Sequence, residues 1–98
     1  MKKSERKQAK QDMRDATQVL LGEILTELRD KRDLAQEDLA YESGIDRSFM
    51  SKIETGKTTL SLLTLMRLTK ALEVDTSDVI KELEKRIKAS KTKSDKKN

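Results

Sequence analysis

The 98-residue chain has no cysteine, histidine or proline, and one tyrosine and one phenylalanine are its only aromatic residues. It therefore has no disulfide, no Cys/His zinc site and no imidazole for general-base catalysis. Its apolar runs fall far short of the roughly 20 residues that cross a bilayer, and no apolar segment follows the basic N-terminus to make a secretory signal. The sequence predicts a soluble cytoplasmic protein that is not an enzyme, uses no metal or cofactor and has no membrane partner.

The formal net charge of +4 belongs to the two ends of the chain. Residues 1–16 hold six cations and three anions, and residues 88–98 hold five lysines and one aspartate. The residues between hold 11 cations and 14 anions, a net charge of −3. We expect one folded domain at 17–87, a basic N-terminal arm at 1–16 and a disordered lysine-rich tail at 88–98. The arm is either flexible, which we favour, or extends the first helix through an apolar stripe of Ala9, Met13, Ala16 and Leu20.

Apolar residues at spacings of three and four predict five helices, over residues 17–31, 36–43, 47–55, 61–72 and 75–87. Gly44 and Gly56 follow the second and third of these, where a positive φ ends a helix. Asp46 is expected to cap the start of the third. The sequence therefore predicts a compact all-α domain.

Residues 36–56, QEDLAYESGIDRSFMSKIETG, have the layout of a helix-turn-helix. In the second helix of this segment Met50 and Ile53 are expected to point inward. The outer face has hydrogen-bond donors and no carboxylate: Arg47, Ser48, Ser51 and Lys52. In an acidic domain, this face indicates that the helix binds a negatively charged ligand. The alternative is that the four residues are ordinary solvent-exposed positions with no ligand.

Residues 21–74 resemble the helix-turn-helix domain of the phage repressor and Cro family, the XRE-type regulators of bacteria. The motifs QEDLA, SGI, SKIETG and SLLTLMRLTKALEV match the family pattern in order. The wording QEDLAYESGIDRS also resembles the controller proteins of restriction-modification systems. The resemblance implies a five-helix, lambda-repressor-like fold and a transcriptional regulator, repressor or activator, that binds an operator in double-stranded DNA.

The resemblance also implies roles for individual residues. The third helix lies in the major groove, where Arg47, Ser48 and Lys52 contact base edges and Ser51 is a secondary candidate. The implied phosphate contacts are Gln36, Lys57, Thr58 and Thr59. Arg29 and Glu54 match a structural ion pair. Asp33 and Ala35 depart from the family pattern, which has a helix-ending glycine and a Ser or Thr cap at these positions.

Family members bind two half-sites as homodimers, so we expect an interface. The residues we assign to it are Leu63, Val79, Ile80, Leu83 and Ile87. The alternative is that the last helix only closes the monomer core. A different function is also open, that of an antitoxin that represses its own operon and binds a toxin protein. If the regulator is an activator, the bound dimer is expected to contact RNA polymerase.

Overall fold

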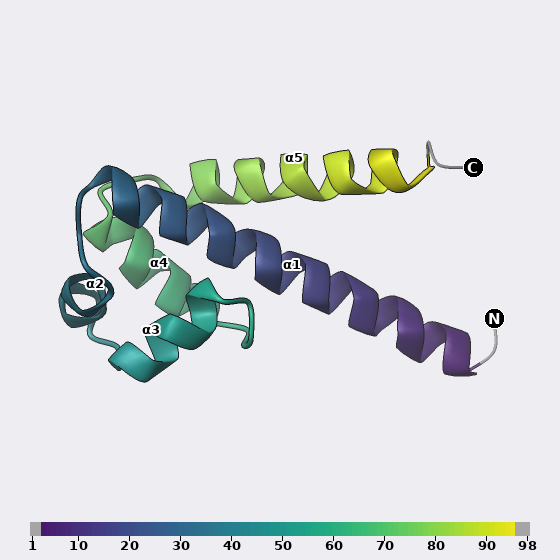
Figure 1. The fold of residues 1–98 in the computed structure, drawn as a ribbon, viewed down its shortest axis with the longest axis horizontal. Helices are drawn as coiled ribbons and strands as arrows, with labels where there is room; N and C mark the ends of the chain where they lie inside the picture. The colour runs from purple at the N-terminus through teal and green to yellow at the C-terminus, as the bar shows by residue number, and fades with distance from the viewer. Residues whose placement is uncertain (1–2, 96–98) are drawn as a thin grey trace.

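The computed structural model describes the backbone of residues 3–95 and the side chains of residues 16–90. The described part of the chain has five helices and no strand (Figure 1). They are α1 (Lys3–Lys31), α2 (Gln36–Ser43), α3 (Arg47–Glu54), α4 (Leu62–Ala71) and α5 (Thr76–Asp95). α1 packs against α3 and α5, α2 packs against α3 and α4, and α4 packs against α5. The all-α class and the helix-turn-helix layout of α2 and α3 are confirmed.

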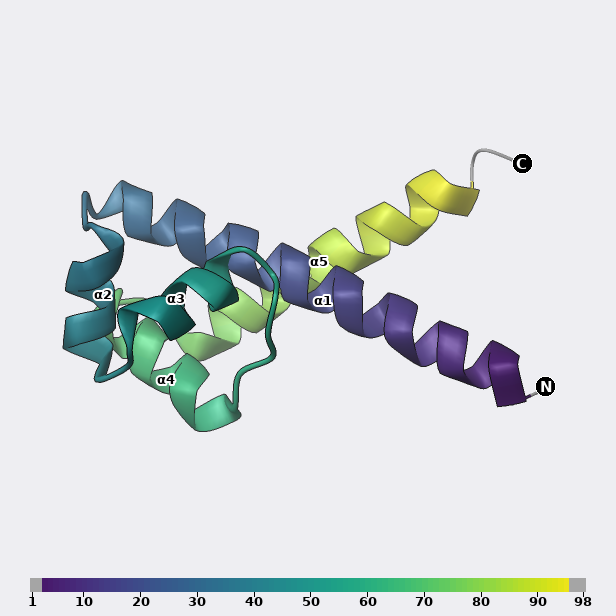
Figure 2. The same cartoon turned by 60° about the horizontal axis from the view of Figure 1, so that its bottom comes forward.

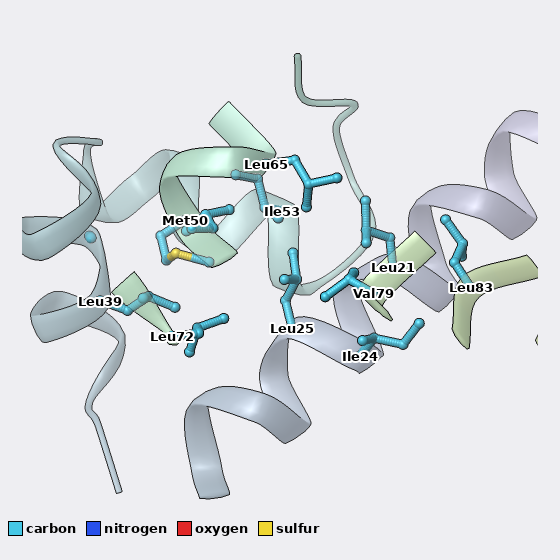
Figure 3. Close-up of a cluster of buried hydrophobic side chains, with 12 residues drawn as sticks. Leu21, Ile24, Leu25, Leu39, Met50, Ile53, Leu65, Leu72, Val79 and Leu83 are labelled. Carbon is cyan, nitrogen blue, oxygen red and sulfur yellow. The ribbon is translucent and has the colours of Figure 1, made fainter. Parts of the chain in front are cut away.

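One hydrophobic core joins all five helices, and its side chains point toward one another in Figure 3. The predicted inward residues of α3, Met50 and Ile53, are 0% and 1% exposed. Leu25 of α1, Leu39 of α2 and Leu68 of α4 are fully buried with them. The apolar spacing of three and four in the sequence therefore identified most of the core-facing residues.

The first four helices end in the same type of turn, in which a residue one or two positions after the helix adopts a positive φ. The four residues are Asp33, Gly44, Gly56 and Glu73, with φ of 57°, 70°, 72° and 59°. In each turn the next N–H donates to a carbonyl five positions earlier, as from Leu34 to Arg29 at 3.2 Å. The predicted ends at the two glycines are confirmed, and the other two turns place non-glycine residues in the left-handed region.

Both ends of the chain differ from expectation. α1 begins at Lys3, so the arm that we favoured as flexible continues the first helix, and α5 continues to Asp95 where we expected a disordered tail from Lys88. Neither segment contains glycine or proline, and Lys, Gln, Arg and Ala are good helix formers. A helix already formed in the core propagates outward through such residues. Residues 1–2 and 96–98 of the expected arm and tail lie outside the described residues.

α1 and α5 lie against each other in the domain and diverge toward their outer ends (Figures 1 and 2). Arg86 of α5 links them, because it donates to Glu27 of α1 at 2.7 Å and to Glu82 of its own helix at 2.8 Å. The hydrogen bond from Arg86 holds the pKa of Glu82 below its ordinary value. We call residues 3–16 the outer half of α1. This half inclines to the side of α3, whereas α5 runs along the other side (Figure 1).

The interface that we assigned to α5 needs correction. Val79 and Leu83 are 3% and 7% exposed in the monomer core, and Ile87 packs half-buried against that core. These three therefore close the monomer, because the stripe they form faces α1. Ile80 and Leu63, at 36% and 60% exposed, remain on the surface. No helix in residues 3–95 is long and apolar enough to span a membrane.

Candidate nucleic-acid interface

α3 displays the four predicted base-contacting residues on the face opposite its buried stripe. Arg47, Ser48 and Lys52 are exposed, and Ser51 is half-buried. The only acidic residue of α3 is Glu54, and its side chain turns inward, so the exposed face of the helix carries no carboxylate. The structure therefore brings these donors together on one exposed surface of a short helix.

The start of α3 differs in detail from the expected cap. Asp46 lies at the N-cap position with φ −71° and ψ 140°, but its side chain accepts no hydrogen bond from the helix backbone. The Ser48 hydroxyl instead donates to Asp46 Oδ2 at 3.2 Å. Asp46 thus holds the side chain of a predicted base-contacting residue.

Arg47 has an acidic neighbour on the adjacent helix. Its Nη1 lies 3.9 Å from Oε2 of Glu37 in α2, and both side chains are about 70% exposed, at 71% and 69%. Exposed pairs of this kind contribute little stability and are screened by salt. The guanidinium can therefore leave Glu37 for a stronger acceptor at small cost.

Glu54 joins three parts of the domain behind the exposed face. Its carboxylate, on a side chain only 4% exposed, accepts from Arg29 Nε at 2.7 Å and Arg29 Nη2 at 3.1 Å. Gln36 Nε2 donates to the same carboxylate at 2.8 Å, and Arg29 Nη1 donates to the Leu34 carbonyl at 2.7 Å. The ion pair that the resemblance implied is present, and its hydrogen bond raises the pKa of Arg29 further. This network fixes α3 relative to α1 and α2.

Gln36 has a structural partner that the sequence did not reveal. Its amide nitrogen carries two N–H donors, and one of them is used by Glu54. The other donor and the free backbone N–H groups at the start of α2 remain suited to a phosphate. The bond spans 18 positions in sequence, so no local spacing indicated it.

The predicted phosphate-contacting loop follows α3. Lys57 and Thr59 are exposed, and half-buried Thr58 donates from its hydroxyl to the Thr59 carbonyl at 3.1 Å. Gly56 begins this loop, and a Cβ there would lie 2.8 Å from Val19 Cα. The loop therefore lies directly against α1, a contact that sequence reasoning missed.

The missing cap at Ala35 is partly replaced. No side chain caps α2 at its N-cap residue, but Asp38 Oδ2 accepts from the Ala35 backbone N–H at 3.0 Å. This bond is the reciprocal half of a capping box. The start of α2 is thus stabilised by the third residue of the helix.

α4 carries an exposed apolar surface that the sequence indicated only in part. Leu62, Leu63 and Met66 are 67%, 60% and 52% exposed. We call these three residues the α4 patch. The spacing of α4 predicts an inward face of residues 62, 65, 66, 68 and 72. Leu65, Leu68 and Leu72 are buried as expected, whereas Leu62 and Met66 face outward. Among the described residues, no group of three acidic side chains is arranged to hold a metal ion.

Comparison with known proteins identifies the family. A helix-turn-helix family model matches residues 25–79. The control protein C.MunI of Mycoplasma sp is 35% identical over 68 residues, which cover 68% of this chain and 92% of that protein. The structure of the restriction-modification controller protein C.AhdI from Aeromonas hydrophila is 38% identical and has a TM-score of 0.61, covering 62% of this chain and 92% of that one.

A third relative was solved on DNA. The restriction-modification controller protein C.Esp1396I, as a tetramer in complex with its natural 35 base-pair operator, is 31% identical with a TM-score of 0.66. The match covers 72% of this chain and 93% of that one. The chain belongs to the XRE-type helix-turn-helix family of DNA-binding transcriptional regulators.

Proposed function

We propose that residues 17–87 form the operator-binding domain of a dimeric transcriptional regulator of the restriction-modification controller type. The observation that carries the proposal is the exposed, acid-free face of α3 in a domain whose net charge is −3. Arg47 suits the O6 and N7 acceptors of guanine bidentately, and Lys52 suits the same acceptors. Ser48 and Ser51 add short donors on the same face.

Residues on either side of α3 position the domain on the sugar-phosphate backbone. Gln36 lies at the start of α2, and Lys57, Thr58 and Thr59 follow α3. Contacts to phosphate fix the register of a protein on DNA without reading sequence. The Arg29–Glu54 pair keeps the two sets of contacts in a fixed relation and does not itself contact DNA.

A second copy of the chain covers the α4 patch. One recognition helix spans only a few base pairs, and two half-sites about one helical turn apart supply the missing specificity. C.Esp1396I is a tetramer on its operator. Leu62, Leu63 and Met66 supply an exposed apolar surface for a two-fold interface, with exposed Ile80 as a further contributor.

The regulator performs no chemical reaction and acts in the cytoplasm, where its DNA target lies. An operator that overlaps a promoter gives repression, and a bound dimer that contacts RNA polymerase gives activation. The control-protein relatives favour this function over that of an antitoxin.

The test separates base reading from phosphate contact. Arg47→Ala and Lys52→Ala should each weaken binding to the preferred duplex by about 1–3 kcal/mol, roughly 5- to 150-fold, with a much smaller effect on random DNA. Lys57→Ala should weaken both duplexes alike. Lys81→Ala, which removes an exposed lysine from α5, is the charge-matched control. Equal losses on both duplexes for all four variants would refute the assigned roles.

A further inference from the structure

The outer half of α1 separates its charges onto two faces. A helix turns about 100° per residue, so five cations fall within an arc of about 100°: Lys3, Arg6, Lys7, Lys10 and Arg14. We call these five positions the cationic stripe. The acids Glu5, Asp12 and Asp15 occupy the opposite face. A helix that needed charge only for solubility would mix the two signs.

The cationic stripe continues the line of the core. At about 100° per residue, the same angular positions on α1 are occupied further along the helix by residues that pack into the domain: Leu21, Ile24, Leu25 and Leu28. The five positions of the cationic stripe therefore share the helical register of the core-facing positions further along α1. The three acids occupy positions turned away from the stripe.

The outer half of α1 starts beside the proposed phosphate-contacting loop. The close approach of Gly56 to Val19 fixes this point, because a Cβ on Gly56 would meet Val19 Cα at 2.8 Å. Figures 1 and 2 show the helix leaving the body there, on the side of α3. From Lys3 to Arg14 the stripe is about 17 Å long, about half of the 34 Å repeat of duplex DNA.

The cations of the stripe have one another as neighbours at helical spacings in the sequence. Lys3 and Lys7, Arg6 and Lys10, and Lys10 and Arg14 are like-charge pairs at i, i+4, which destabilise a free helix. Residues 3–16 contain no opposite-charge pair at spacings of three or four. Duplex DNA, with one negative charge per about 1.7 Å of axis, supplies the opposite charge for such a row of cations.

We propose that the outer half of α1 is a second, sequence-independent DNA-binding element, whose cationic stripe contacts the phosphates that flank the half-site read by α3. This inference rests on the proposed function of α3 and extends its footprint. The stripe adds affinity and salt dependence and leaves base preference unchanged. The helix also becomes more stable when it binds, because phosphate replaces repulsion between neighbouring cations.

The experiment uses the full chain and two duplexes. One duplex ends at the edges of the preferred site, and the other has about one further helical turn of unrelated sequence on each side. The stripe variant carries Lys7→Gln, Lys10→Gln and Arg14→Gln. The matched variant changes charge equally on the opposite face through Glu5→Gln, Asp12→Asn and Asp15→Asn. Kd is measured across a salt series, with thermal melts and sedimentation as checks on folding and assembly.

The wild-type chain should bind the longer duplex about 10-fold more tightly, with a slope of log K against log salt that is steeper by about 2–3, since each phosphate contact contributes about 0.9. The stripe variant should lose this gain, and the acid-face variant should keep it. Persistence of the gain in the stripe variant overturns the inference. The inference also fails if the stripe variant loses affinity and the acid-face variant gains it by the same factor, because net charge alone would then explain both results.

Three further outcomes are distinct. A stripe variant that keeps the gain from flanking DNA but dissociates in sedimentation assigns the stripe to a second copy of the chain, and the inference fails. A wild-type chain that prefers a defined duplex but gains nothing from flanking DNA refutes only the role of α1. A wild-type chain without any sequence preference refutes the proposed function of α3.

Discussion

Glu54 controls the position of α3 at the scale of single residues. Its buried carboxylate is stabilised by two donors from Arg29 and one from Gln36. A buried charge left without partners costs several kcal/mol, so these bonds hold the end of α3 in one place. The family motif predicted the Arg29 pair. The contribution of Gln36 depends on the packing of α2 against α3, which no spacing in the sequence encodes.

Asp33 gives a prediction at the same scale. Its φ of 57° lies in the left-handed region, where a residue with a Cβ is strained by about 1 kcal/mol and glycine is not. Asp33→Gly should therefore raise the free energy of unfolding by about 0.5–1 kcal/mol, measured by urea denaturation.

Glu23→Gly is the matched control for Asp33→Gly, because Glu23 is also an exposed acidic residue but lies within α1. It should lower the free energy of unfolding by about 1 kcal/mol. A destabilising Asp33→Gly would show that the aspartate side chain stabilises the turn more than its backbone strain costs.

At the scale of helices, the sequence predicted the inner parts of all five elements and missed the outer parts of α1 and α5. The inner parts carry apolar stripes that must be buried. The outer parts carry too little apolar surface to fold alone, which favoured disorder. They are helical because each continues a helix that is anchored in the core, and no glycine or proline interrupts them.

The approach of α1 to α3 depends on backbone contacts that leave no pattern in sequence. A Cβ on Gly22 would lie 2.6 Å from the carbonyl oxygens of Ile53 and Glu54. Gly22 thus allows the two helix backbones to come close. Glycine within a helix is intrinsically unfavourable by about 1 kcal/mol, and this contact explains its presence.

Gly56 and Gly44 test the importance of such contacts. Both have φ near 70°, but a Cβ on Gly44 meets nothing within 4 Å, whereas one on Gly56 meets Val19. Gly44→Ala should lower the free energy of unfolding by about 1 kcal/mol through backbone strain alone. Gly56→Ala should lower it by about 2–4 kcal/mol because crowding adds to the strain.

Thermal and urea denaturation of the two glycine variants give the comparison. Equal losses would mean that the loop moves away from α1 at no cost. The outer half of α1 would then lack the fixed position relative to Lys57 that we infer.

At the scale of the whole molecule, the charge and the apolar surface are divided between different parts. The domain of residues 17–87 is net acidic, and its only proposed base-reading surface is one face of α3. The basic charge lies on the two outer ends of the chain. The sequence allowed α5 either to close the monomer core or to form the dimer interface. Val79 and Leu83 are buried in the monomer core, and the α4 patch is the surface that we propose for assembly.

The central claim is that α3 reads DNA sequence as one of two paired recognition helices. Selection of bound duplexes from a random pool tests it most directly, with the wild-type chain and Arg47→Ala run in parallel. We expect the wild-type chain to enrich two inverted half-sites whose centres lie about 10–10.5 base pairs, or a multiple of that spacing, apart. Arg47→Ala should lose the preference at one symmetric guanine position. Enrichment of no sequence by the wild-type chain, or of identical sites by both proteins, would contradict the claim.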